Sequence, residues 1–242
     1  MHIEKIKTAL FKKGDPLLAF VLHHVPKLEN GDVLVITSKI IALAERRVGK
    51  IKDKEKLIRK ESKEIISTPW AFLTLTSDGW GINAGIDESN ADDEIILLPK
   101  DPFASAEKLL LKLKAHYKIN KLGVLITDTR SVPLRVGTVG RAIGFAGFKP
   151  LKSYIGKDDL FGRKSRVTQS NHADALAAAS VCVMGEGSEQ TPLALIKNAP
   201  ITFTPRPLPL KAKKLYMLPR EDIFSFIFTH AVAKPAPLPK KK

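Results

Sequence analysis

Apolar positions along the chain fall into short runs, which are separated by polar stretches or by stretches that contain glycine and proline. Such runs predict buried strands when they are about four to eight residues long and end at turn-forming residues. By this criterion we expect strands within residues 33–36, 93–99, 124–127 and 193–200. Residues 70–85 predict a hairpin with Ser77-Asp78-Gly79 at its turn.

Other segments have the spacing of helices. Ser38 is predicted to cap a helix over about 39–47, and Ser105 is predicted to cap another. Residues 51–64 are so highly charged that they predict a solvated helix or loop, whereas 172–184 predict a buried helix that ends at Gly185. The helix after Ser105 has an apolar face opposite its lysines, formed by Ala106, Leu109, Leu110, Leu113 and Tyr117.

These strands and helices follow one another without strict alternation. The pattern therefore predicts an α+β (mixed α/β) fold, with an α/β core carrying antiparallel additions as the other arrangement. The length of 242 residues is enough for one large domain or two small ones. Residues 206–242 predict a C-terminal extension whose basic, proline-rich end is disordered.

The formal net charge of +15 changes this picture by indicating anionic partners, although solubility explains it equally well. Nucleic acid is disfavoured, because aromatic residues make up only 7% of the chain and do not alternate with basic ones. No apolar run approaches the roughly 20 residues that span a bilayer, and the first residues do not form a secretory signal. We therefore expect a cytoplasmic protein with no membrane span. The single cysteine, Cys182, is predicted to be a buried, inert thiol.

Two acidic positions lie where apolar segments end. Asp128 and Thr129 follow a predicted strand, and oxygen ligands at the carboxyl end of a strand suit a hard divalent cation. Asp87, Ser89 and Asn90 cluster in a loop that follows Gly81 and Gly85. Each position has a simpler interpretation: Asp128 could cap a turn, and Asp87 could form an Asx turn.

A third acidic position is Glu186, between Gly185 and Gly187. Glycines let main-chain N–H groups approach phosphate, but the same residues also fit an ordinary helix C-cap. Neither this loop nor "GTVGRAIG" has the spacing of a dinucleotide fingerprint, and the chain has no P-loop. Basic residues between the acidic positions provide cations for phosphate and carboxylate groups, or are surface charges: Arg135, Arg141, Lys149, Lys152, Lys157 and Arg163.

Seven segments together resemble the coenzyme F(420)-0:L-glutamate ligase family, the γ-glutamyl ligases. They are "GDVLVITSKI", "NAGIDESN", "LLPKDP" with "SAEKL", "GVLITDT", "VGTVGRAIGFAGFKPL", "IGKDDLFGR" and "MGEGSEQTP". They occur in family order over most of residues 1–200, whereas nothing beyond about residue 205 is similar. The resemblance implies one ligase domain over 1–205, with two intertwined lobes and an intertwined homodimer.

The resemblance also implies a GTP-dependent amide ligase that uses two divalent ions, Mg or Mn. An acceptor carboxylate would attack the γ-phosphate of GTP, and the amine of L-glutamate would then displace phosphate from the acyl phosphate. Arg135 and Arg141 are the expected catalytic residues, since they can hold the developing charge.

Carried over by position, Asp87 and Asp128 are expected to hold one metal, and Thr129 and Glu186 the second. The expected nucleotide contacts are Thr8, Ala9, Leu10, Phe11, Ser38, Lys39, Asn90, Met184, Gly185, Gly187, Ser188, Glu189, Gln190 and Thr191.

Two departures from the family pattern leave alternatives open. Leu43 stands where the family often has a lysine, so a protein that binds nucleotide without catalysis remains an alternative. The loop "MGEGSEQT" replaces the family's "MGEGGDGI" and is similar to a branch associated with folates. The acceptor is therefore expected to be a coenzyme F(420)-0-like molecule, with a folate as the alternative.

Overall fold

The computed structural model describes residues 1–89, 93–205, 208, 215–217, 221–224 and 226. Helices and strands are both abundant, so the predicted α+β class is confirmed. The chain divides into two compact units, one formed by Met1–Arg46 with Pro99–Lys213 and the other by Arg47–Leu98 with Lys214–Lys242. Most of the predicted C-terminal extension, including its proline-rich end, lies outside the described residues.

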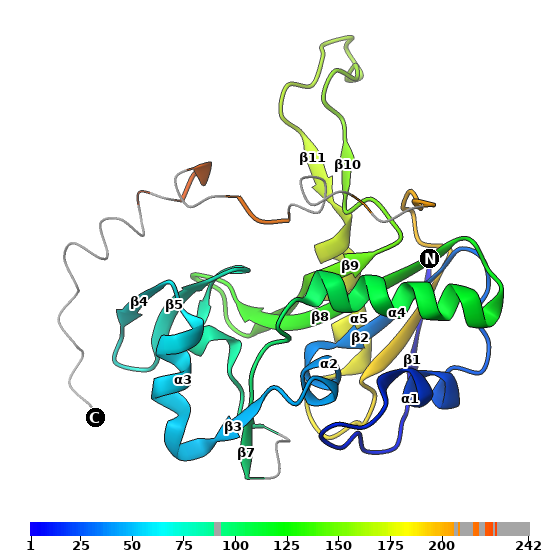
Figure 1. Ribbon diagram of the computed structural model, residues 1–242. Coiled ribbons are helices and arrows are strands. Elements are labelled where there is room, and N and C mark those ends of the chain that lie inside the picture. The colour runs from blue at the N-terminus through cyan, green and yellow to red at the C-terminus, as the bar shows by residue number, and fades with distance from the viewer. Residues whose placement is uncertain (90–92, 206–207, 209–214, 218–220, 225, 227–242) are drawn as a thin grey trace. The chain divides into compact units, whose positions relative to one another are not determined.

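The described part of the first unit is built on a mixed sheet with the strand order β1-β12-β2-β8-β9 (Figure 1). Its strands are β1 (His2–Ile6), β2 (Asp32–Thr37), β8 (Leu122–Ser131), β9 (Thr138–Ala146) and β12 (Leu193–Lys197). β2 and β8 are parallel, whereas the other neighbouring strands are antiparallel. The predicted strands at 33–36, 124–127 and 193–200 are thereby confirmed.

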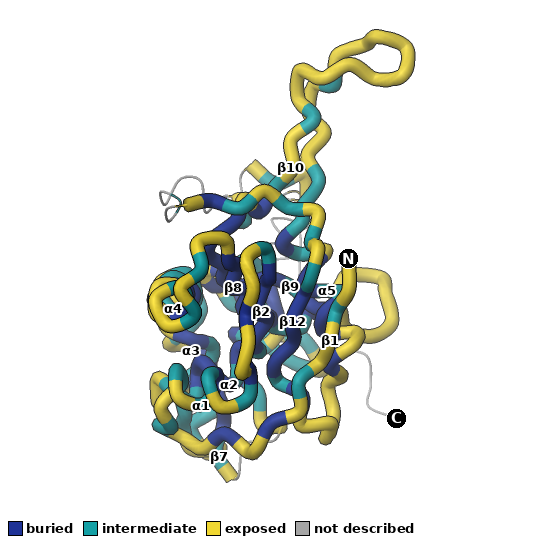
Figure 2. The backbone as a smooth tube through the Cα atoms, turned by 90° about the vertical axis from the view of Figure 1, so that its right-hand side faces the viewer, coloured by how far each residue is buried: buried dark blue, intermediate teal, exposed yellow. Residues whose placement is uncertain are grey.

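Helices cover both faces of this sheet, as Figure 2 shows. α1 (Leu17–His24), α2 (Ser38–Ala44) and α4 (Pro102–Tyr117) lie on one side, and α5 (His172–Met184) lies on the other. The central strands are therefore buried on both faces, which explains their continuous apolar runs. The predicted buried helix that ends at Gly185 is confirmed as α5.

The glycines of "VGTVGRAIGFAG" are explained by this close packing. A Cβ at Gly140 would lie 2.6 Å from the Ala177 carbonyl oxygen of α5, and one at Gly144 would lie 2.5 Å from the Pro102 carbonyl oxygen of α4. The two glycines face opposite sides because the pairing of β8 with β9 shifts between Ile126 and Thr127. Because these two positions have no side chain, α5 and α4 can pack closely against the sheet.

A long hairpin arm leaves β9 of the first unit and returns to α5. Its base is the antiparallel pair β10 (Leu151–Ser153) and β11 (Gln169–Asn171), and most of the arm is exposed (Figure 2). Several large apolar side chains on the arm are exposed: Ile155, Leu160, Phe161 and Val167.

The second unit contains two small antiparallel sheets. β3 (Val48–Lys50) pairs with β7 (Glu94–Ile96), and β5 (Phe72–Thr76) lies between β4 (Glu64–Ser67) and β6 (Gly79–Ile82). The 3₁₀ turns η1 (Ile51–Asp53) and η2 (Asn83–Gly85) and the helix α3 (Lys54–Glu61) are the other described elements between Arg47 and Leu98. The predicted hairpin is β5–β6, and the predicted strand at 93–99 contains β7, so both are confirmed. The described part of this unit has a hydrophobic core that contains Ile58, Ala84, Ile86, Ile95 and Leu97.

Three local predictions were wrong. The carboxylate of Asp101, not Ser105, caps α4 by accepting from the Ala104 N–H at 2.9 Å, while the Ser105 hydroxyl donates to Glu45. Ser38 makes no cap, because α2 begins at Ser38 itself and Thr37 occupies the cap position. Cys182 is exposed. Only one side of α5 packs against the sheet, and Cys182 lies on another side of the helix.

Candidate functional site

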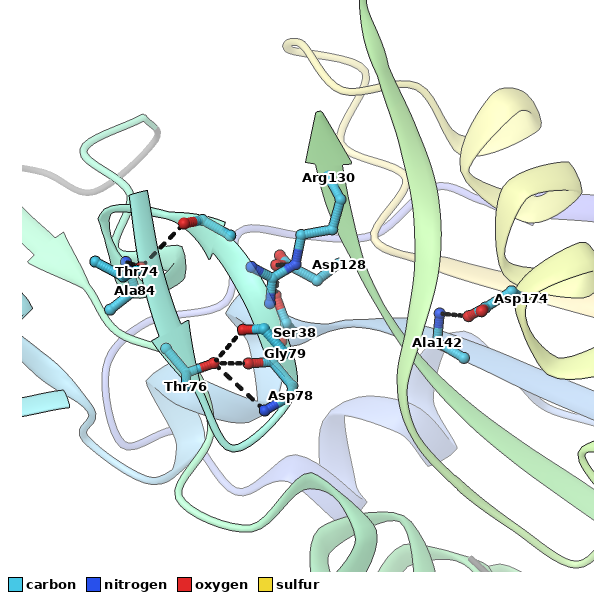
Figure 3. Close-up of polar contacts among 11 residues, drawn as sticks. Ser38, Thr74, Thr76, Asp78, Gly79, Ala84, Asp128, Arg130, Ala142 and Asp174 are labelled. Carbon is cyan, nitrogen blue, oxygen red and sulfur yellow. Dashed lines mark hydrogen bonds and ion pairs between the residues drawn. The ribbon is translucent and has the colours of Figure 1, made fainter. Parts of the chain in front are cut away.

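Parallel pairing of β2 with β8 brings Ser38 to Asp128. Thr37, the last residue of β2, is in register with Thr127 of β8, so the next residue on each strand lies at the same edge. The Ser38 hydroxyl donates to Asp128 Oδ1 at 3.0 Å, as Figure 3 shows. Ser38 is buried and Asp128 is half-buried. The two side chains are separated by 90 residues along the chain.

β8 does not end at Asp128, as the sequence led us to expect, but continues to Ser131. Asp128 pairs with Arg141 of β9, and Thr129 pairs with Gly140. β8 continues past Asp128 because it still pairs with β9 beyond the point where β2 ends and α2 begins. Asp128 is therefore held by a strand and does not cap a turn.

Arg130 is a site residue that the sequence interpretation missed. It lies two positions beyond Asp128, so both side chains project from the same face of β8 (Figure 3). Arg130 is buried, and its Nε lies 4.0 Å from Asp128 Oδ2. The two-residue spacing of an acid and a base in an apolar strand was the signal that could have identified this pair.

Two predicted nucleotide-contact segments meet beside β2. The Thr8 N–H donates to the Gln190 carbonyl at 2.9 Å, and the Thr37 N–H donates to the Pro192 carbonyl at 3.0 Å. The Thr191 hydroxyl donates to the Met184 carbonyl and closes the loop 184–191 across its base. Thr8 is therefore bonded to the loop 184–191, and Pro192, directly after the loop, is bonded to the residue that precedes α2.

Within this loop, the glycines have different surroundings. Gly185 caps α5 with φ +80°, as the simpler interpretation of the glycines predicted. The Gly187 N–H donates to Glu189 Oε2 at 2.8 Å. The Glu186 carboxylate accepts from the Thr138 hydroxyl at 3.0 and 3.1 Å, which connects the loop to β9. Ser188 is exposed.

Asp87 lies in the second unit, where its carboxylate accepts from the main-chain N–H of Ser89 at 2.7 Å and from the Ser89 hydroxyl at 2.9 Å. This is the Asx turn that the sequence offered as one interpretation. Asn90 lies outside the described residues.

The remaining predicted residues vary in exposure. Lys39 is half-buried in α2, Arg141 is half-buried opposite Asp128, and Arg135 is exposed in the connection between β8 and β9. In the segment 8–11, Leu10 is 73% exposed, whereas Phe11 is buried.

Comparison with known proteins identifies the family. A family model described as F420-0:Gamma-glutamyl ligase matches residues 5–198. The chain belongs to this family. The coenzyme F420:L-glutamate ligase of Archaeoglobus fulgidus is 35% identical over 210 residues, which cover 78% of this chain and 84% of the relative. The enzyme of the same name from Methanothermobacter thermautotrophicus is 38% identical over 195 residues, 72% of this chain and 77% of the relative.

Family membership confirms the resemblance found in the sequence and supports the coarser prediction that the protein is a γ-glutamyl ligase. A third relative, from Methanocaldococcus jannaschii, is 32% identical over 241 residues, or 90% of this chain and 94% of its own length. The similarity therefore spans both units of the fold and extends beyond residue 205, where the motifs had indicated no resemblance. Among the described residues, no helix is both long and apolar enough to cross a bilayer.

Proposed function

We propose that the protein is a GTP- and divalent-metal-dependent ligase that joins L-glutamate to a coenzyme F420-0-like acceptor. The observation that carries this proposal is the Ser38–Asp128 pair, which lies where β2 ends and its parallel pairing with β8 stops, in a chain of the γ-glutamyl ligase family. Ligands of open α/β sheets bind beyond the carboxyl ends of such strands. The neighbouring segments 8–11 and 184–191 supply main-chain groups for a nucleotide at the same edge.

The oxygen donors of this region fit a metal that arrives with the nucleotide. Asp128 would hold one ion, and Thr129 with Glu186 the other. Within the described parts of the chain, no three or more His, Cys, Asp or Glu side chains gather into a metal site. Mg²⁺ in nucleotide sites is commonly bound by one or two carboxylates together with phosphate oxygens, so a complete protein cage is not required. A bound ion would neutralise charge on the phosphates.

The proposed reaction has two chemical steps. An oxygen of the acceptor carboxylate attacks the γ-phosphorus of GTP, so that an acyl phosphate forms and GDP leaves. The neutral α-amine of L-glutamate then attacks the acyl carbon, loses a proton, and phosphate leaves as the amide forms. Arg135 and Arg141 would hold the anionic groups, because guanidinium forms paired hydrogen bonds with phosphate and carboxylate.

A folate γ-glutamyl ligase is the second candidate, and the loop 184–191 is the observation that favours it. Gln190 presents an exposed amide where the family loop has glycine, and a polar edge suits a pterin ring. The Thr191 hydroxyl does not add to this edge, because it is buried and donates to the Met184 carbonyl. Only Gln190 supports the folate candidate.

A competition assay decides between the acceptors. We expect that incubation with GTP, Mn²⁺, L-glutamate and both acceptors extends the coenzyme F420-0-type acceptor by one or more glutamates, detected as mass increments. Addition to dihydrofolate or tetrahydrofolate alone would overturn the deazaflavin assignment. Addition to neither acceptor would favour a protein that binds nucleotide without catalysis.

We also propose that the protein is a homodimer, with the β10–β11 arm in the interface. Leu160 is 97% exposed and Phe161 is 82% exposed on the described arm, and contact with a second chain would remove this apolar surface from water.

Light scattering should give twice the chain mass of 26.6 kDa. The double variant Leu160→Lys with Phe161→Glu should give the single-chain mass, and an unchanged mass would exclude the arm from the interface.

A further inference from the structure

His24, the last residue of α1, forms hydrogen bonds through both of its ring nitrogens. Nε2 lies 3.0 Å from the Ala9 main-chain nitrogen, and Nδ1 lies 2.9 Å from the Phe20 carbonyl oxygen. A main-chain N–H can only donate, so Nε2 is the acceptor and carries no proton. Nδ1 carries the proton and donates a hydrogen bond to the Phe20 carbonyl oxygen. The imidazole therefore connects the end of α1 to the segment 8–11.

Aromatic packing also holds the segment 8–11 against α1. Phe11 is buried, and its ring meets that of Phe20 edge to face with the centroids 4.8 Å apart. The Phe20 ring in turn lies 4.5 Å from the imidazole of His24. On the far side, the Thr8 N–H is bonded to the Gln190 carbonyl. The segment is thus held between α1 and the loop 184–191, while Leu10 projects into solvent.

We propose that His24 is the positioning residue of the nucleotide site, which it serves by holding Ala9 and thereby the main chain of residues 8–11. This inference rests on the proposed function, because the segment matters for catalysis only if GTP binds against it. His24 does not itself contact the nucleotide. Without its imidazole, the Ala9 N–H must bond to water, and GTP binding must then restrain a freer segment.

Two substitutions at His24 and one at its neighbour test this role. His24→Ala removes the acceptor, whereas His24→Gln places an amide oxygen near the former Nε2 and can accept from Ala9. His23→Ala is the matched control, since His23 is an exposed imidazole in ring contact with His24. We expect His24→Ala to weaken GTP binding in Mn²⁺ about five- to tenfold, as one lost hydrogen bond predicts. His24→Gln should restore most of the affinity, and His23→Ala should match the wild type.

Kinetics and amide exchange separate positioning from a general structural role. KM for GTP should rise in His24→Ala while kcat stays within about twofold of the wild type, because positioning acts on binding. The Ala9 amide should exchange faster in His24→Ala than in wild type or His24→Gln. A lowered melting temperature with unchanged KM, or no rescue by glutamine, would overturn the proposal.

The wild-type measurement distinguishes failure of this inference from failure of the proposed function. If the wild-type protein does not bind GTP, the proposed function falls and the positioning role of His24 falls with it. If the wild type binds GTP and His24→Ala binds it equally well, the proposed function stands and only the inference about His24 is wrong.

Discussion

Asp128→Asn is expected to lower the rate of glutamate transfer by about 100-fold or more, because it would remove one anionic ligand from the proposed metal ion between enzyme and nucleotide. Asparagine has nearly the same shape and still accepts from the Ser38 hydroxyl, so the melting temperature should change little. Steady-state kinetics with circular dichroism on the same samples measures both effects. Near-normal turnover at moderate Mg²⁺ would exclude Asp128 as a metal ligand.

Two further variants show whether the carboxylate itself is responsible. Asp53→Asn removes one negative charge from the start of α3, where the Asp53 side chain makes no cap hydrogen bond, and should leave turnover unchanged. Ser38→Ala keeps the charge of Asp128 but removes the hydroxyl that orients it. We expect Ser38→Ala to lower turnover by about tenfold, a smaller loss than that of Asp128→Asn.

GTP binding is expected to require a divalent cation. A triphosphate placed at the edge where Asp128 and Glu186 lie would be repelled by their carboxylates unless a metal ion neutralises the charge. Calorimetry should therefore show GTP affinity about 100-fold lower in EDTA than in Mn²⁺, which corresponds to roughly 2.7 kcal/mol. Equal affinity under the two conditions would contradict the two-metal site.

The variant Asp128→Asn also serves as the internal control for this experiment. In EDTA it should bind GTP more tightly than the wild type, because one repelling charge is gone. In Mn²⁺ it should bind GTP less tightly, because one proposed metal ligand is gone. An equal loss of affinity in both conditions would instead indicate damage to the nucleotide site.

The regular elements were mostly predictable because the physical signal is local. The runs at 33–36 and 124–127 are buried on both faces by helices, so all of their residues except Thr127 are apolar. The hairpin at Ser77-Asp78-Gly79 and the helix end at Gly185 follow from turn and cap chemistry, which involves neighbouring residues only.

The errors arose where two local signals competed. Asp101 and Ser105 are both good cap residues, and Pro102 after Asp101 decided the start of α4, because proline fits the first turn of a helix. Ser38 follows a strand and precedes a helix, which is the position of a cap, but its hydroxyl bonds to a carboxylate that the local sequence does not contain.

The amino-acid sequence alone determined the family, the α+β class and most elements, because motifs, apolar periods and turn residues act over a few positions. Tertiary structure decided which of these residues meet. Parallel pairing of β2 with β8 joins Ser38 to Asp128 across 90 residues, and the same strand adds Arg130 to them. The bonds from Thr8 to Gln190 and from Ala9 to His24 depend likewise on how the sheet and α1 pack. Such contacts are set by strand register and helix placement, to which every part of the core contributes, so no local stretch of the sequence specifies them.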